Sequence, residues 1–277
     1  MASIGPTARY TSRVWARNGL SHPAFDSLEG RVLHTVTAPT MMASRLVGGP
    51  TLDGMLLSRH LVIDALLENA IAAGRVGQVL EVACGMSPRG WRFTERHSQL
   101  VYVEADLPDM AARKRAALET IGRPERHRVV ELDALEPDGP LSLAAVAGDL
   151  DPQLGLAIIT EGLLSYLPRP AVLELWARFA ETIARFPDGA YLSDLHIDSD
   201  VARPIARAFE AALSAFVGTA VAVHFATPDE ARQALLDAGF GNASVLRADE
   251  HPAAAGRPGA GRVRVVEATT PHHRVDS

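Results

Sequence analysis

Residues 78–90 read QVLEVACGMSPRG, an apolar run that passes directly into a glycine-containing turn. Its first part, QVLEVA, is short and aliphatic, which is typical of a strand buried on both faces of a parallel sheet. In a doubly wound sheet, ligands bind outside the carboxyl ends of the strands, so the turn after this strand should face a ligand. Gly85 would let the backbone approach that ligand closely, although an ordinary β–α turn also uses glycine.

Strand and helix patterns alternate on both sides of this stretch. A helical pattern over 55–74 leads into it and ends on Gly74, a plausible C-cap. Further strands are expected at 100–106, 127–134, 154–162 and 189–196, and helices at 87–96, 108–122 and 170–186. This alternation predicts a parallel sheet with helices on both faces.

The C-terminal part departs from the alternation. A capped helix over 227–240 is followed by two strand patterns, 243–248 and 263–269, with only a Gly/Pro-rich turn between them. Two strands without an intervening helix imply an antiparallel hairpin at the sheet edge. We therefore expect a doubly wound α/β domain with a seven-stranded, mostly parallel sheet whose last strand is antiparallel.

Two regions are expected to cover this domain. Residues 1–55 are rich in Gly, Pro, Ser and Thr, which favours an N-terminal cap of short helices and irregular segments over the main domain, 56–277. A helical insert at about 198–226 is expected to complete a lid with this cap. A dimerisation helix or plain core would show the same periodicity.

The composition of the chain argues against several classes of partner and site. The 277 residues carry a net charge of -6 with 47% hydrophobic content, so the chain lacks the global basic surplus of nucleic-acid-binding proteins. The single cysteine, Cys84, excludes an intrachain disulfide, and no Cys/His spacing predicts a metal site. No apolar run has the length of a membrane span or signal sequence. We expect a cytoplasmic protein with a small-molecule substrate, no metal, and neither nucleic acid nor membrane as partner.

Acidic residues follow successive strands of the expected sheet. Asp106 stands 21 residues beyond Gly85, where a carboxylate can accept hydrogen bonds from both hydroxyls of a ribose. A solvated acid or a helix N-cap is the alternative for this residue. Asp133 follows the third strand and Glu161 the fourth. Ala83 replaces the first glycine of a GxGxxG turn, which argues against a pyrophosphate-binding loop.

The sequence resembles the leucine carboxyl methyltransferase family, especially its bacterial branch associated with O-methylation of polyketides and other small molecules. The resemblance covers residues 59–166 well and the flanks loosely. Its most specific parts are EVACGMSPRGWRF at 81–93, EADLP at 104–108 and EGLLSYLP at 161–168. It implies a class I methyltransferase that uses S-adenosyl-L-methionine and releases S-adenosyl-L-homocysteine.

The resemblance also implies a cofactor site. Arg59 would bind the carboxylate of the cofactor's methionine part, Asp106 the ribose, Asp133 with the Ala134 backbone the adenine, and Glu161 the methionine end near its ammonium. Without the resemblance, Arg59 would be read as a surface residue of an amphipathic helix. The complete expected set is Arg59, Glu81, Ala83, Gly85, Asp106, Leu107, Asp133, Ala134 and Glu161.

The expected reaction is methylation of a carboxylate or hydroxyl oxygen of a small, polyketide-like molecule. Methylation of a protein phosphatase's C-terminal leucine, the eukaryotic role of the family, is the less favoured acceptor. Tyr166, His196 and His224 are the candidates for a role beside the acceptor, because a hydroxyl acceptor would need a base whereas a carboxylate would not. A non-catalytic cofactor-binding module and a nicotinamide-dependent reductase are the alternatives, and the missing GxGxxG and the terminal hairpin argue against the reductase.

Overall fold

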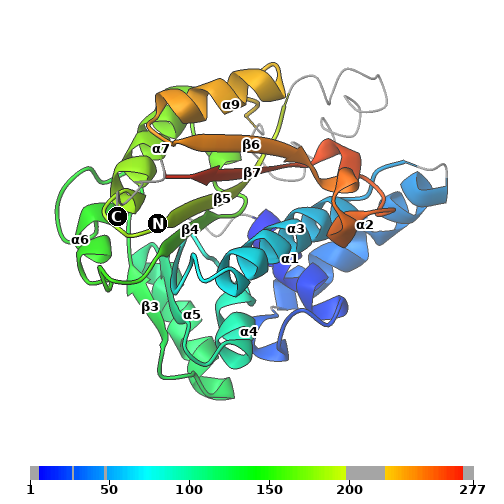
Figure 1. Cartoon of the computed structure of the whole chain (residues 1–277). Helices are drawn as coiled ribbons and strands as arrows, with labels where there is room; N and C mark the ends of the chain where they lie inside the picture. The colour runs from blue at the N-terminus through cyan, green and yellow to red at the C-terminus, as the bar shows by residue number, and fades with distance from the viewer. Residues whose placement is uncertain (1–5, 27, 47–48, 198–221, 271–277) are drawn as a thin grey trace.

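The computed structural model describes residues 6–26, 28–46, 49–197 and 222–270. Within them the chain forms a seven-stranded sheet with the order β3-β2-β1-β4-β5-β7-β6 (Figure 1). The strands are β1 (Gln78–Val82), β2 (Val101–Asp106), β3 (His127–Glu131), β4 (Leu156–Thr160), β5 (Gly189–Leu195), β6 (Asn242–Arg247) and β7 (Arg264–Thr269).

The sheet has the predicted topology. Strands β1 to β5 are paired in parallel, whereas β7 is antiparallel to both β5 and β6. Val82 at the end of β1 is level with Ala105 of β2 and Thr160 of β4. The turns that leave these strands therefore begin at one edge of the sheet, which is called the rim below. The predicted fold class, a doubly wound sheet with an antiparallel last strand, is confirmed.

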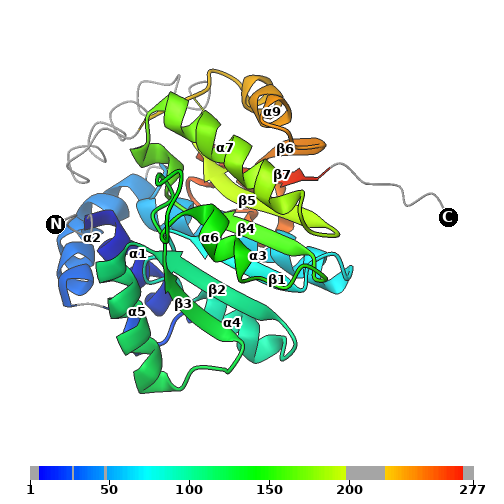
Figure 2. The same cartoon turned by 90° about the vertical axis from the view of Figure 1, so that its left-hand side faces the viewer.

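Helices cover both faces of the sheet (Figure 2). On one face, Trp176 and Phe179 of α7 are fully buried in a large apolar core that also includes Leu235 of α9. On the other face, α3 packs over β5 and β7, and its apolar side chains share a core with residues of β1 and β4. The helices are α1 (Pro6–Arg17), α2 (Leu28–Leu46), α3 (Leu52–Ala72), α4 (Arg89–Arg96), α5 (Pro108–Ile121), α6 (Leu143–Gly148), α7 (Arg169–Ile183) and α9 (Pro228–Asp237).

The N-terminal region differs from its prediction. Helix α2 has 19 residues and continues through Pro39, so the expectation of only short helices and irregular segments is wrong. Composition suggested breaks there, but contacts with α1 favour the helix, because tertiary packing supplies most helical stability in proteins. Helix α3 begins at Leu52, since the Thr51 side chain caps it by accepting from the Gly54 amide. The expected cap boundary at residue 55 therefore lies inside α3.

The N-terminal region packs on the rest of the protein through α3 and, at Phe25, through α5. Tyr10, Val14 and Trp15 of α1 form an apolar cluster with three leucines at the start of α3. Of the expected lid insert, residues 198–221 lie outside the described residues, and Phe225 is bridged to Ile197. Across the described ranges, no helix is both long and apolar enough to cross a membrane.

We predict that Gly54→Ala destabilises the protein. A Cβ at Gly54 would lie 2.0 Å from the Pro258 carbonyl oxygen, so α3 and the segment before β7 would have to separate. Such overpacking costs about 1–3 kcal/mol of unfolding free energy, measurable as a lower urea midpoint. Gly148→Ala is the matched control, because no atom lies within 4 Å of a Cβ there. Equal midpoints for the two variants would contradict the close approach.

Candidate functional site

The turn after β1 has an unusual backbone. Ala83 and Gly85 both have positive φ, 54° and 52°. Such a φ is strained for alanine, and strain of this kind gathers at ligand sites. The position of a Cβ on Gly85 has no atom within 4 Å, so the turn leaves open space at that point.

Asp106 at the end of β2 is held directly against this turn. Its Oδ2 accepts a hydrogen bond from the Gly85 amide at 2.7 Å, and its Oδ1 accepts from the Leu107 amide at 2.8 Å. Burial raises the pKa of the Asp106 carboxyl above its usual value, and the two amide donors oppose that rise. Each oxygen keeps one lone pair for a further donor. Gly85 and Asp106, which are 21 residues apart in the sequence, are therefore in direct contact in the structure.

The next two turns add apolar surface and a second acid. Leu107 after β2 and Leu135 after β3 are exposed, although both are large and apolar. Asp133 lies beside them, with its Oδ1 accepting from the Leu135 amide at 2.9 Å. The Ala134 carbonyl accepts from Arg178 at 3.1 Å. Exposed leucines beside a carboxylate suit a flat apolar ring that carries an amino group, which is the chemistry of adenine.

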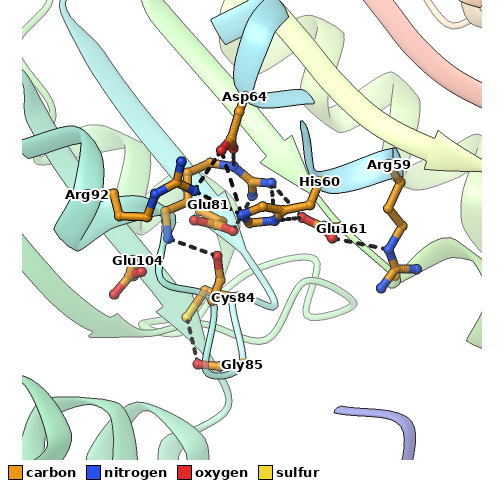
Figure 3. Close-up of polar contacts among 12 residues, drawn as sticks. Arg59, His60, Asp64, Glu81, Cys84, Gly85, Arg92, Glu104 and Glu161 are labelled. Atoms are coloured by element: carbon orange, nitrogen blue, oxygen red, sulfur yellow. Dashed lines mark hydrogen bonds and ion pairs between the residues drawn. The ribbon is translucent and has the colours of Figure 1, made fainter. Parts of the chain in front are cut away.

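A buried cluster of charges lies behind the turn (Figure 3). Its centre is Arg89, the first residue of α4, whose side chain is fully buried. The guanidinium donates to Asp64 of α3 at 2.6 Å, to Glu81 of β1 at 2.7 Å and to Glu161 after β4 at 2.5 Å. Glu81 also accepts from the Tyr102 hydroxyl at 2.6 Å. Its carboxylate therefore joins β1 to α4 and to β2.

Glu161 lies between this cluster and Arg59 (Figure 3). Its Oε2 is 2.8 Å from Nδ1 of His60 and 2.5 Å from Arg89, and its Oε1 accepts from Nε of Arg59 at 3.1 Å. Burial alone would raise the pKa of Glu161, but the surrounding His60, Arg89 and Arg59 hold it well below its usual range. Glu161 is therefore ionised at neutral pH.

Arg59 comes from α3 and reaches the same edge. Besides Glu161 it contacts Asp194 of β5, with Nη1 and Oδ2 3.0 Å apart. Burial would lower the pKa of Arg59, yet Asp194 and Glu161 raise it above its usual value. The side chain is 13% exposed, so it is neither a surface arginine nor fully enclosed. A guanidinium at the rim can bind a carboxylate with paired hydrogen bonds.

The three acceptor-side candidates lie around the start of the helical turn η2 (Leu164–Tyr166) and the end of β5. Tyr166 is 48% exposed. Nδ1 of His196 lies 3.4 Å from the Ser165 hydroxyl. His224 is buried and its Nε2 lies 2.9 Å from the Leu164 carbonyl oxygen, which gives it a bond to the backbone. Their part in a reaction stays a prediction.

Sequence reasoning missed several residues of the site. The motif at 81–93 contains Arg89 but gives no sign of its role, and Asp64, His60 and Asp194 stand out in no motif. The one available signal was the concentration of charged residues in an otherwise apolar helix, SRHLVID at 58–64. Among the described residues, no group of three or more His, Cys, Asp or Glu side chains is placed to hold a metal ion.

Comparisons with known proteins concern the family and the fold of this chain. The model of the leucine carboxyl methyltransferase family matches residues 20–180. A predicted S-adenosyl-L-methionine-dependent methyltransferase of Mycobacteroides abscessus is 34% identical over 151 residues, 53% of this chain and 48% of the relative. A second one, from Mycolicibacterium gilvum, is 35% identical over 43% of this chain and 38% of the relative. The chain thus spans about half the length of the curated relatives that it matches, or less.

A solved structure extends the comparison to the whole fold. The crystal structure of a predicted methyltransferase from Thermobifida fusca superposes with a TM-score of 0.68, covering 97% of this chain and 96% of that one at 15% identity. At this level of identity the likeness concerns the fold alone.

We predict that Arg89→Met destabilises the protein strongly. The variant leaves Asp64, Glu81 and Glu161 without their common cation, and breaking a buried ion pair costs about 3–5 kcal/mol. Arg96→Met is the matched control, since Arg96 lies on the same helix and is 51% exposed beside Glu68. The check is chemical denaturation of both variants. A loss for Arg89→Met no greater than for Arg96→Met would refute the importance of the cluster.

We predict that Glu161 stabilises the folded protein at neutral pH and that this stabilisation is lost at acidic pH. Its folded-state pKa is depressed, so its contribution is fully present above the unfolded value of about 4.3 and is lost as pH falls toward the folded value. Glu161→Gln should therefore be less stable than wild type at pH 7, and the gap should narrow below about pH 4. Urea unfolding between pH 3 and 7 measures this gap. A gap that is independent of pH would rule out an ionised Glu161.

Proposed function

This chain belongs to the leucine carboxyl methyltransferase family, and we propose that it transfers the methyl group of S-adenosyl-L-methionine to a carboxylate or hydroxyl oxygen of a small molecule. The observation that carries the proposal is the pairing of Asp106 with Gly85 at the rim of the sheet. A polyketide-like acceptor met in the cytoplasm is part of the proposal, and the net charge of -6 gives no basic surplus that would favour nucleic acid as the acceptor instead.

The rim fits each part of this cofactor. Asp106 keeps acceptor capacity for the ribose hydroxyls, and the open space over Gly85 leaves room for the chain that joins the ribose to the amino-acid part. Leu107, Leu135 and Asp133 suit the adenine. Arg59 suits the carboxylate at the other end, and Oε1 of Glu161 keeps a lone pair for the ammonium.

The residues would act mainly by positioning. When bound, the cofactor supplies a methyl group on a positively charged sulfur, which is already activated for transfer. The protein must hold the acceptor oxygen in line with that methyl group, and such alignment alone can lower a barrier by about 7–11 kcal/mol. Asp106 and Arg59, fixed at opposite ends of the site by their hydrogen bonds, set the donor's position.

The acceptor would be met near Tyr166 and His196. The exposed Tyr166 offers a ring and a hydroxyl for contact with the acceptor. A carboxylate acceptor needs no base, whereas a hydroxyl acceptor needs a group to take its proton, which is the role proposed for His196. The Ser165 hydroxyl would orient that imidazole through Nδ1.

We predict that the protein binds S-adenosylhomocysteine and that Asp106→Asn weakens binding about 10- to 100-fold. The amide replaces a charged acceptor of the ribose hydroxyls, and hydrogen bonds to charged groups contribute about 1.5–3 kcal/mol. Asp109→Asn is the matched control, because Asp109 is exposed on the next turn of chain. Isothermal titration calorimetry measures both, with NADPH as a control ligand.

The outcomes separate the proposed function from its alternatives. Binding of NADPH, or of neither ligand, would overturn the proposal. Binding of the homocysteine analogue without methyl transfer to any acceptor in a broad screen of carboxylates, phenols and alcohols would favour a non-catalytic cofactor-binding module. Methyl transfer is followed with cofactor that carries a labelled methyl group.

A further inference from the structure

Arg59 is held by two carboxylates that come from neighbouring strands. Glu161 lies just after β4 and binds Nε of Arg59 at 3.1 Å, and Asp194 lies near the end of β5 and binds Nη1 at 3.0 Å. The side chains of both acids are at most 4% exposed. Two buried acceptors on different nitrogens fix the plane of the guanidinium as well as its position.

Asp194 also holds the turn that carries Glu161. Its Oδ1 accepts from the Gly162 amide at 2.6 Å while Oδ2 binds Arg59. Gly162 has a φ of +74°, and a Cβ on it would lie 3.0 Å from Nη2 of Arg59. The backbone of this turn therefore lies against the guanidinium, and one carboxylate sets the distance between the two.

These contacts use two of the three nitrogens of the Arg59 guanidinium. Among the described residues, no hydrogen bond engages Nη2 of Arg59, whereas Nε and Nη1 are both bonded. We propose that Asp194 is a positioning residue that presents Nη2 of Arg59 to the carboxylate of the bound cofactor's amino-acid part. This inference rests on the proposed function.

A general structural role for Asp194 is already filled by its neighbours. The end of β5 is joined to β4 by the hydroxyl groups of Ser193 and Thr160, 2.8 Å apart, and by those of Tyr191 and Thr160, also 2.8 Å apart. The strand also pairs with β7 through residue 195. Asp194→Asn should therefore fold, with its one carbonyl oxygen accepting from the Gly162 amide and its NH₂ group turned toward Arg59.

The test compares three ligands that differ only at the amino-acid end. S-adenosylhomocysteine has both carboxylate and ammonium, its decarboxylated analogue keeps only the ammonium, and methylthioadenosine has neither. With Asp194→Asn we expect affinity for S-adenosylhomocysteine to fall about tenfold or more, while the other two ligands bind as they do to wild type. Asp188→Asn, at the opposite end of the same strand, is the matched control and should bind all three normally.

Every other pattern overturns the inference. Equal loss for all three ligands indicates a structural role, and loss for the decarboxylated analogue as well indicates direct contact with the ammonium. No loss shows that Arg59 does not need Asp194. If wild type fails to bind S-adenosylhomocysteine, the proposed function itself is wrong, so the two failures are distinguishable.

Two further variants protect the test. If circular dichroism shows that Asp194→Asn is unfolded, Asp194→Ser replaces it, since a serine hydroxyl is too short to reach Arg59 from that position. In an Arg59→Met background, Asp194→Asn should cause no additional loss for S-adenosylhomocysteine. Additive losses would show that Asp194 acts independently of Arg59.

Discussion

The buried guanidinium of Arg89 is the interaction on which the rim depends. It joins a helix, a strand and a turn, because its three carboxylate partners lie in α3, in β1 and after β4. Burying such charges is costly, and an apolar replacement of the whole cluster could be as stable. The cluster instead fixes geometry. It sets the position of α3 relative to the sheet, and with it the position of Arg59, which is adjacent to His60 in that cluster.

A second buried ion group supports the same turn from the other side. Glu104 of β2 lies 3.0 Å from Lys114 of α5 and 2.9 Å from His127 of β3, and all three are fully buried. Lys114 also donates to the Ser87 carbonyl. Gly90 lies over this group, where a Cβ would be 2.6 Å from the His127 ring. The turn after β1 is thus held at Ser87 by Lys114 and at Gly85 by Asp106.

The sequence predicts the parts of this arrangement that depend on local pattern. The parallel strands with their helices, the terminal hairpin and the proximity of Gly85 to Asp106 follow from alternating periodicity and from the spacing of 21 residues. That Asp64, Glu81 and Glu161 share Arg89 could not be predicted, because they are separated by up to 97 residues and no local pattern links them. Asp194 lies within β5, all of whose residues are buried, and nothing in the sequence of that strand marks it as a partner of Arg59. The length of α2 was missed because packing against α1 overrides its composition.

The charge balance of the rim gives a physical reason for the kind of ligand it would accept. The guanidinium groups of Arg59, Arg89 and Arg92 face four carboxylates, those of Asp64, Glu81, Glu161 and Asp194, and the His60 imidazole lies among them. The cluster therefore has no large surplus of either sign. An unmatched charge in such a buried site would be screened less than at the surface. A ligand whose amino-acid end carries both a carboxylate and an ammonium adds one charge of each sign and keeps this balance, whereas a ligand with only one of the two groups does not.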